Sequence, residues 1–140
     1  MAIAPHFLTP LLKTPDGDLG LWVHGLALPV VTRLSGAFDS ASRKRGLLGR
    51  TSLAEDEALV IAPCSAVHTF GMQFAIDLVY ADRTGRVLKI RKSVPRNRVS
   101  AAWGAFAVIE LAAGTVARTG IGLGSRLELQ GTPSSSSDVP

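Results

Sequence analysis

The chain has a single cysteine, Cys64, and few aromatic residues, which make up 6% of its 140 residues. One cysteine cannot form an internal disulfide, so folding needs no oxidising compartment. Because aromatic side chains are scarce, valine, leucine, isoleucine and alanine have to fill the core. Charged residues account for 19% of the chain and hydrophobic residues for 46%. This balance excludes a disordered chain and is typical of a globular protein.

Long hydrophobic runs are also missing. The longest, residues 19–31, contains His24 and Pro29, and it is shorter than the roughly 20 apolar residues of a membrane-spanning helix. The N-terminus lacks the basic start and the unbroken apolar stretch of a secretion signal. We therefore expect a cytoplasmic protein with no membrane span.

The length predicts one domain, which is large enough to bury a core without disulfides or metals. Pro5, Pro10 and Pro15 restrict the backbone around them, so residues 1–18 are expected to form an extended N-terminal arm. Residues 131–140 are polar and serine-rich, which is typical of a disordered C-terminal tail. A single β-rich domain is therefore predicted over residues 19–130.

Short apolar segments separated by turn residues dominate this domain. Short helices are predicted at residues 40–45, capped by Asp39 or Ser40 and ended by Gly46, and at residues 113–119. Asp82 and Gly85 indicate a type I turn between two strands. The predicted strands are residues 21–28, 58–62, 67–70, 76–81, 87–93, 106–111 and 126–129. The pattern predicts a mainly β fold, a compact β-sandwich or barrel of short strands with one or two short helices.

Three blocks of the sequence resemble those of a known protein family. They are Arg-Gly-Leu-Leu-Gly-Arg at residues 45–50, the stretch 64–90, and the glycine-containing residues 109–127. In this order they resemble the bacterial and archaeal family called domain of unknown function 192, over about residues 43–129. The resemblance implies a compact, mainly β domain with short helices and no established activity. Gly71, Ala75 and Ser125 stand where members usually have an aromatic residue, proline and aspartate.

The unusual residue types of the chain concentrate between residues 64 and 77, beside glycines that permit close approach. We predict a small groove there, for a small-molecule or protein ligand, which makes the protein a binding or accessory module. The residues expected to form the groove are Cys64, His68, Met72, Asp77, Trp103 and Glu110. Asp77 and Glu110 are each flanked by apolar residues, so the pattern favours carboxylates that face solvent. Two alternatives remain for these carboxylates. They could face a shared cavity with raised pKa values, or they could be buried with hydrogen bonds to Arg50 or a turn amide.

The alternative is a hydrolase or thiol-dependent enzyme. Cys64 and His68, with Asp77, are the residue types of a thiolate–imidazole–carboxylate system. The apolar setting of Cys64 indicates instead a small buried side chain. Zinc needs three or four ligands, and His6 and His24 are distant in sequence, so no metal site and no cofactor is predicted.

A second alternative follows from the net charge of +4. Arg43, Lys44 and Arg45, together with Lys89 and Arg91, could merge into a basic patch that contacts nucleic acid or another polyanion. No aromatic residue is interleaved to stack bases, and no nucleic-acid-binding motif is present. The sequence therefore favours solvated cations that protect a sheet edge.

Overall fold

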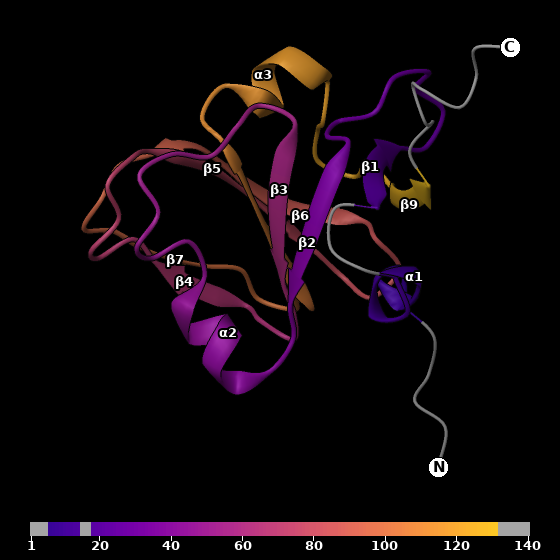
Figure 1. Ribbon diagram of the computed structural model, residues 1–140. Coiled ribbons are helices and arrows are strands. Elements are labelled where there is room, and N and C mark those ends of the chain that lie inside the picture. The colour runs from indigo at the N-terminus through magenta and orange to yellow at the C-terminus, as the bar shows by residue number, and fades with distance from the viewer. Residues whose placement is uncertain (1–5, 15–17, 132–140) are drawn as a thin grey trace, which may run out of the picture.

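The computed structural model describes residues 6–14 and 18–131. Within these ranges the chain forms nine strands and three short helices (Figure 1). The helices are α1 (Thr9–Leu12), α2 (Ser40–Arg45) and α3 (Thr115–Thr119). The strands are β1 (Leu19–Val23), β2 (Arg33–Ala37), β3 (Glu57–Ile61), β4 (Ala66–His68), β5 (Ile76–Ala81), β6 (Val87–Val94), β7 (Val99–Ala101), β8 (Ala107–Ala112) and β9 (Leu127–Gly131).

A five-stranded sheet in the order β2-β3-β8-β5-β6 forms the centre of the fold. Strands β2 and β3 are parallel, and the other neighbours are antiparallel. Two two-stranded antiparallel sheets, β1-β9 and β4-β7, accompany it. The central sheet keeps open edges at β2 and β6, so the described residues form no closed barrel. The mainly β prediction is confirmed, and of its two forms the barrel is wrong.

Both faces of the central sheet are covered. Side chains alternate between the faces along a strand, so Val79 and Ile109 join the larger core while Leu78, Tyr80 and Val108 join a second, smaller core. Every residue of β5 and β8 is buried. These two strands therefore provide the rigid support for whatever lies on either face.

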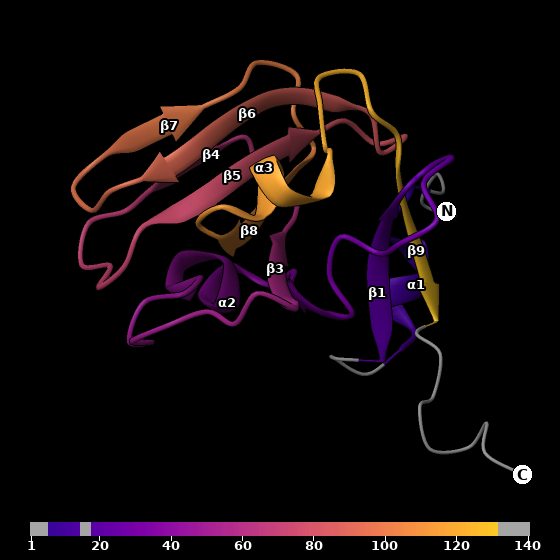
Figure 2. The ribbon, with the colours of Figure 1, turned by 90° about the horizontal axis from the view of Figure 1, so that it is seen from above.

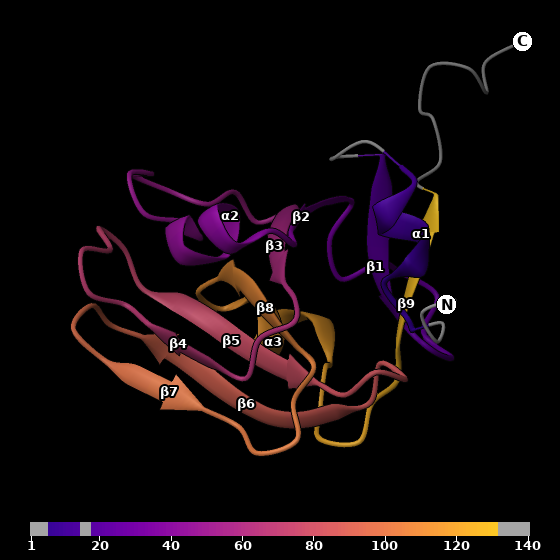
Figure 3. The same ribbon diagram turned by 90° about the horizontal axis from the view of Figure 1, so that it is seen from below.

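The elements beyond the central sheet divide into two groups in space. The β1-β9 pair and α1 lie together at one side of the molecule, and α2 with the β4-β7 pair lies at the other (Figures 1 and 2). The view from below shows the same separation (Figure 3). Strands β1 and β9 thus pair with each other although they come from opposite ends of the sequence, while α2 and β4 face the second core.

Several local predictions are confirmed. Helix α2 has the predicted bounds, the Asp39 carboxylate accepts a hydrogen bond from the Ser42 amide at 2.8 Å, and Gly46 ends the helix with φ +48°. Strand β5 also has the predicted bounds. The turn that follows it closes through a 3.0 Å hydrogen bond from the Gly85 amide to the Asp82 carbonyl.

Other features were not predicted. Strands β2 and β7 are absent from the prediction, and the first strand ends at Val23 rather than at residue 28. Residues 9–12 form α1 with Leu11 buried, so this part of the expected arm is helical. Residues 1–5, 15–17 and 132–140, which include the predicted tail after Gly131, lie outside the described residues. None of the described helices is long and apolar enough to cross a membrane.

Candidate functional site

A pocket of about 570 Å³ lies between α2 with its following loop and the segment that contains β4. We call it the α2 pocket. Its lining residues are Ser40, Arg43, Lys44, Arg45, Gly46, Leu47, Leu48, Ile61, Cys64, Ala66, Val67, His68, Met72 and Glu110. Four of the six predicted groove residues, Cys64, His68, Met72 and Glu110, are brought together here.

Glu110 is the most unusual residue of this pocket. It lies on β8, with Leu59 of β3 and Leu78 of β5 as its cross-strand neighbours. The side chain is 4% exposed, and its Oε1 atom makes no hydrogen bond within the described part of the chain. Burial raises the pKa of Glu110 from 4.5 to about 7, because a carboxylate loses hydration in an apolar setting. The prediction that favoured solvent exposure for this carboxylate is wrong.

Gly46 allows the backbone after α2 to approach Glu110. A Cβ atom at position 46 would lie 3.2 Å from Glu110 Oε1 and 3.6 Å from Ile61 Cδ1, and the backbone there has a positive φ that other residues rarely adopt. The next residue, Leu47, is 3% exposed and belongs to the second core. The end of α2 is therefore held against the sheet at the point where Glu110 faces the pocket.

Cys64 also lines the pocket and is half-buried. Its amide donates to the Phe106 carbonyl at 2.9 Å, and its thiol donates to the Ala66 carbonyl at 3.1 Å. Burial, with the charge of Glu110, raises the pKa of the Cys64 thiol, and the hydrogen bond to Ala66 and the positive charge of Arg43 oppose this effect only in part. Since the thiolate is the nucleophilic form, the pocket holds the cysteine in its less reactive state.

His68 is exposed at the end of β4. Its Nδ1 accepts a hydrogen bond from the Phe70 amide at 3.2 Å, and its ring lies 5.4 Å from the Phe70 ring between centroids. The hydrogen bonds of Cys64 and His68 thus go to different backbone groups. Among the described residues none joins the thiol to the imidazole.

Met72 is 4% exposed and packs in the second core. Its amide donates to the Thr69 carbonyl at 3.1 Å. Met72 therefore presents an apolar surface to the pocket, together with Leu47, Leu48, Ile61 and Val67.

Asp77 does not line the pocket. It is fully buried on the opposite face of β5, where its carboxylate accepts hydrogen bonds from the Ser93 amide at 2.8 Å and the Val116 amide at 2.9 Å. These bonds link a register shift in the β5-β6 pairing to the first turn of α3. Asp77 and Glu110 share no cavity, and of the three predicted settings Asp77 fits the buried carboxylate that binds backbone amides.

Trp103 is the other predicted groove residue that lies elsewhere. Its side chain is fully exposed just after β7, and it is not among the residues that line the α2 pocket.

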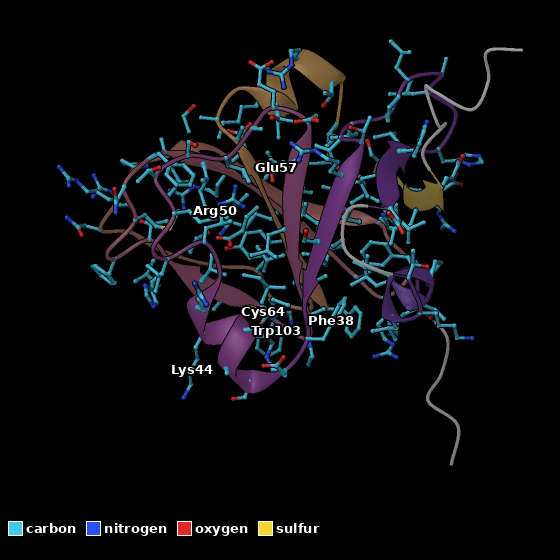
Figure 4. All side chains as sticks on the ribbon, viewed as in Figure 1. Phe38, Lys44, Arg50, Glu57, Cys64 and Trp103 are labelled. Atoms are coloured by element: carbon cyan, nitrogen blue, oxygen red, sulfur yellow. The ribbon has the colours of Figure 1, made fainter. Side chains whose placement is uncertain are left out.

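The predicted basic patch is divided. Arg43, Lys44 and Arg45 line the α2 pocket, whereas Lys89 and Arg91 of β6 line a separate hollow beside residues 121–123. Lys44 reaches outward from α2, away from the sheet (Figure 4). Arg43 donates from Nη1 to the Phe38 carbonyl at 2.6 Å, and its charge acts on the Cys64 thiol. Arg43 is therefore the cation whose position relative to the pocket is best defined.

The lining residues supply one carboxyl group, one thiol, one imidazole and the cationic side chains of α2 beside apolar side chains. Within the described ranges, no group of three or more histidine, cysteine or acidic side chains could hold a metal ion. The role of α2 in this pocket was not predicted. The signals in the sequence that could have indicated it are Gly46, which was expected to end the helix, and the two leucines that follow it.

Comparison with known proteins bears on the family and the fold of this chain. The model of the family domain of unknown function 192, described as Uncharacterized ACR, matches residues 28–129. No curated protein matches the chain.

Two crystal structures are similar in fold. A protein of unknown function from Novosphingobium aromaticivorans has a TM-score of 0.70 and 26% identity, with 78% of this chain and 83% of that chain covered. A putative transcription regulator from Sinorhizobium meliloti has a TM-score of 0.70 and 22% identity, with 79% and 90% covered. Both likenesses concern the fold.

Proposed function

Because the chain belongs to the family called domain of unknown function 192, for which no activity is established, we propose its function from its own site. We propose that the protein is a binding module that holds a small molecule in the α2 pocket. The observation that carries this proposal is the Oε1 atom of Glu110, which is buried, lacks a hydrogen-bond partner in the described part of the chain, and belongs to a pocket-lining residue.

The energetic argument is direct. A buried polar atom left without a partner costs about 1 to 3 kcal/mol. A ligand that donates a hydrogen bond to Glu110 removes this cost and gains specificity from it. The pocket volume of about 570 Å³ lies within the range of about 300 to 1,000 Å³ that small-molecule sites occupy. Mostly apolar walls with a few polar groups are also typical of such sites.

The same residues argue for binding rather than for thiol catalysis. A catalytic cysteine needs a lowered pKa or an adjacent base. Burial raises the pKa of Cys64, and its thiol donates to a backbone carbonyl. The alternatives of a thiol enzyme and of a polyanion-binding patch have no comparable observation in their favour.

Cys64 provides the test, since it lines the pocket and is the only cysteine. A library of small fragments is screened by protein NMR, and the alkylation rate of Cys64 by iodoacetamide is then measured with each fragment that binds. We expect at least one fragment to slow alkylation and to shift the resonances of Glu110 and its neighbours.

The control variant is Trp103→Ala, which changes an exposed side chain outside the pocket and should leave fragment binding unchanged. The variant Glu110→Leu, which removes the hydrogen-bonding group, should weaken it by about tenfold, as the loss of roughly 1.4 kcal/mol implies. If every binding fragment maps elsewhere and Cys64 is never protected, the proposal is wrong.

A further inference from the structure

Resting on the proposed function, we infer the chemical class of the ligand. It is an aliphatic zwitterion, with an ammonium group that pairs with Glu110 and a carboxylate that pairs with Arg43. The inference is carried by two groups of opposite charge that line the same pocket, Glu110 and Arg43, and by the apolar side chains that line it with them.

The first group is the Glu110 carboxyl. A carboxylate at this depth needs a partner charge or several hydrogen bonds, and its Oε1 has neither within the described residues. A neutral donor such as a hydroxyl satisfies the hydrogen bond alone. An ammonium group satisfies the hydrogen bond and also stabilises the ionised carboxylate.

The second group is the Arg43 guanidinium. Its 2.6 Å hydrogen bond to the Phe38 carbonyl holds it beside α2. The ion pairs of the described residues involve Arg33, Arg50, Arg118 and His24, and Arg43 takes part in none of them. By contrast, Arg50 is paired with Glu57 at 3.2 Å (Figure 4). A guanidinium held in this way presents several donors that suit a carboxylate.

Apolar side chains form the walls around these two charges. They are Leu47, Leu48, Ile61, Val67 and Met72. This apolar part of the lining favours a hydrocarbon chain, because its side chains offer no hydrogen bonds to a sugar or another polyol. The inferred ligand therefore combines an apolar body with charged ends.

Ionisation gives the inference a pH dependence. The ionisable groups around Glu110 are Arg43, Lys44 and Arg45 of α2, Cys64, His68 of β4, and Tyr80 of β5, on which the charges of Cys64 and Glu110 act. Since Glu110 titrates at about 7 and an aliphatic ammonium stays charged, affinity should rise about tenfold from about pH 6 to about pH 8. His68 also lines the pocket, so His68→Asn is included as a variant.

The experiment measures binding of straight-chain ω-amino carboxylates of about four to eight carbons, a range that fits the pocket volume. Each is compared with the carboxylate and the amine of the same chain length. Isothermal titration calorimetry follows binding at each pH. At the best length the zwitterion should bind at least about tenfold more tightly than either matched compound, because each charge pair contributes more than about 1.4 kcal/mol.

Matched variants test which protein residue binds each charged end of the zwitterion. Glu110→Gln should remove the pH dependence and weaken the zwitterion about tenfold, while Glu57→Gln, on an acid outside the pocket, should do neither. Arg43→Gln should weaken the zwitterion and the carboxylate but not the amine. Arg43→Lys should restore part of the affinity, and Arg91→Gln on β6 should have no effect.

The outcomes separate this inference from the proposed function. Equal affinity of zwitterion and matched carboxylate, or unchanged affinity in Glu110→Gln, overturns the inference. So does a pocket that binds library fragments but none of the ω-amino carboxylates. A pocket that binds neither fragments nor zwitterions overturns the proposed function as well.

Discussion

The stability of the protein should depend on pH through Glu110, and the size of the effect follows from its burial. The folded-state pKa is about 7 against an ordinary value of 4.5. At about 1.4 kcal/mol for each pH unit between the two values, ionising Glu110 costs the folded state on the order of 3 kcal/mol.

The sign follows from proton counting. Between about pH 4.5 and about pH 7 the folded protein keeps the Glu110 proton while the unfolded chain loses it, so stability falls as pH rises through this window. The stabilisation is fully present below the unfolded pKa and is lost once the pH exceeds the folded pKa. From about pH 5 to about pH 8 this one carboxyl removes about 2.5 kcal/mol of unfolding free energy.

Urea denaturation at a series of pH values measures the effect. For a urea dependence of about 1 to 3 kcal/mol per molar, the midpoint of the wild type should fall by about 0.8 to 2.5 M between about pH 5 and about pH 8. Glu110→Gln stays neutral and nearly isosteric, so its midpoint should be much flatter over this range. At about pH 8 the variant should be the more stable protein by about 3 kcal/mol, less any cost of burying the amide.

Glu57→Gln is the matched control. The Ala54 amide, followed by Arg50, holds the pKa of Glu57 below its usual range. Its stabilisation is therefore lost only as pH falls below about 4.5, outside the window. This variant should keep the wild-type slope. An unchanged slope in Glu110→Gln, with the Glu110 carboxyl titrating near 4.5 by carbon NMR, would show that the argument from burial is wrong.

Three further outcomes are expected. Gly46→Ala should lower the unfolding free energy, measured by urea denaturation, by about 1 kcal/mol or more, because the position has φ +48° and the new Cβ would crowd Glu110. Gly25→Ala is the control, since Gly25 also has a positive φ but a Cβ there meets no atom within 4 Å. The difference between the two variants separates the effect of crowding from that of backbone strain. Asp77→Ala should cost about 2 to 5 kcal/mol by the same measurement, since it leaves two backbone amides without their acceptor, and a loss below about 0.5 kcal/mol would contradict that account. Alkylation of Cys64 should show a midpoint above the ordinary thiol pKa, because burial raises its pKa; a midpoint near neutral pH would instead support the thiol-enzyme alternative.

Local signals in the sequence were sufficient for the elements that depend on short-range physics. Helix α2 begins where Asp39 can accept from a backbone amide and ends where Gly46 can adopt a positive φ. The turn at Asp82 and Gly85 has the residues that its geometry requires. Strand β5 is a short run of β-favouring and apolar residues, and it folds with the predicted bounds.

The strands that were not predicted form because they pair with strands that are distant in the sequence. Strand β2 has the sequence Arg-Leu-Ser-Gly-Ala, whose residues have little intrinsic preference for strands. It forms a strand because it pairs in parallel with β3, across a connection that contains α2. Strand β7 similarly depends on β4. The local sequence pattern of a strand does not predict such pairings, because the strand is stabilised by contacts with its partner strand.

The candidate site shows the same division. The sequence alone indicated that the unusual residue types of this chain concentrate between residues 64 and 77. The apolar neighbours of Glu110 in the sequence also made it a candidate site residue. Only the tertiary structure decided that Glu110 faces the α2 pocket while Asp77 faces the other side of the sheet. The physical reason is the strand period of two residues, which fixes opposite faces only once the register between β5 and β8 is known.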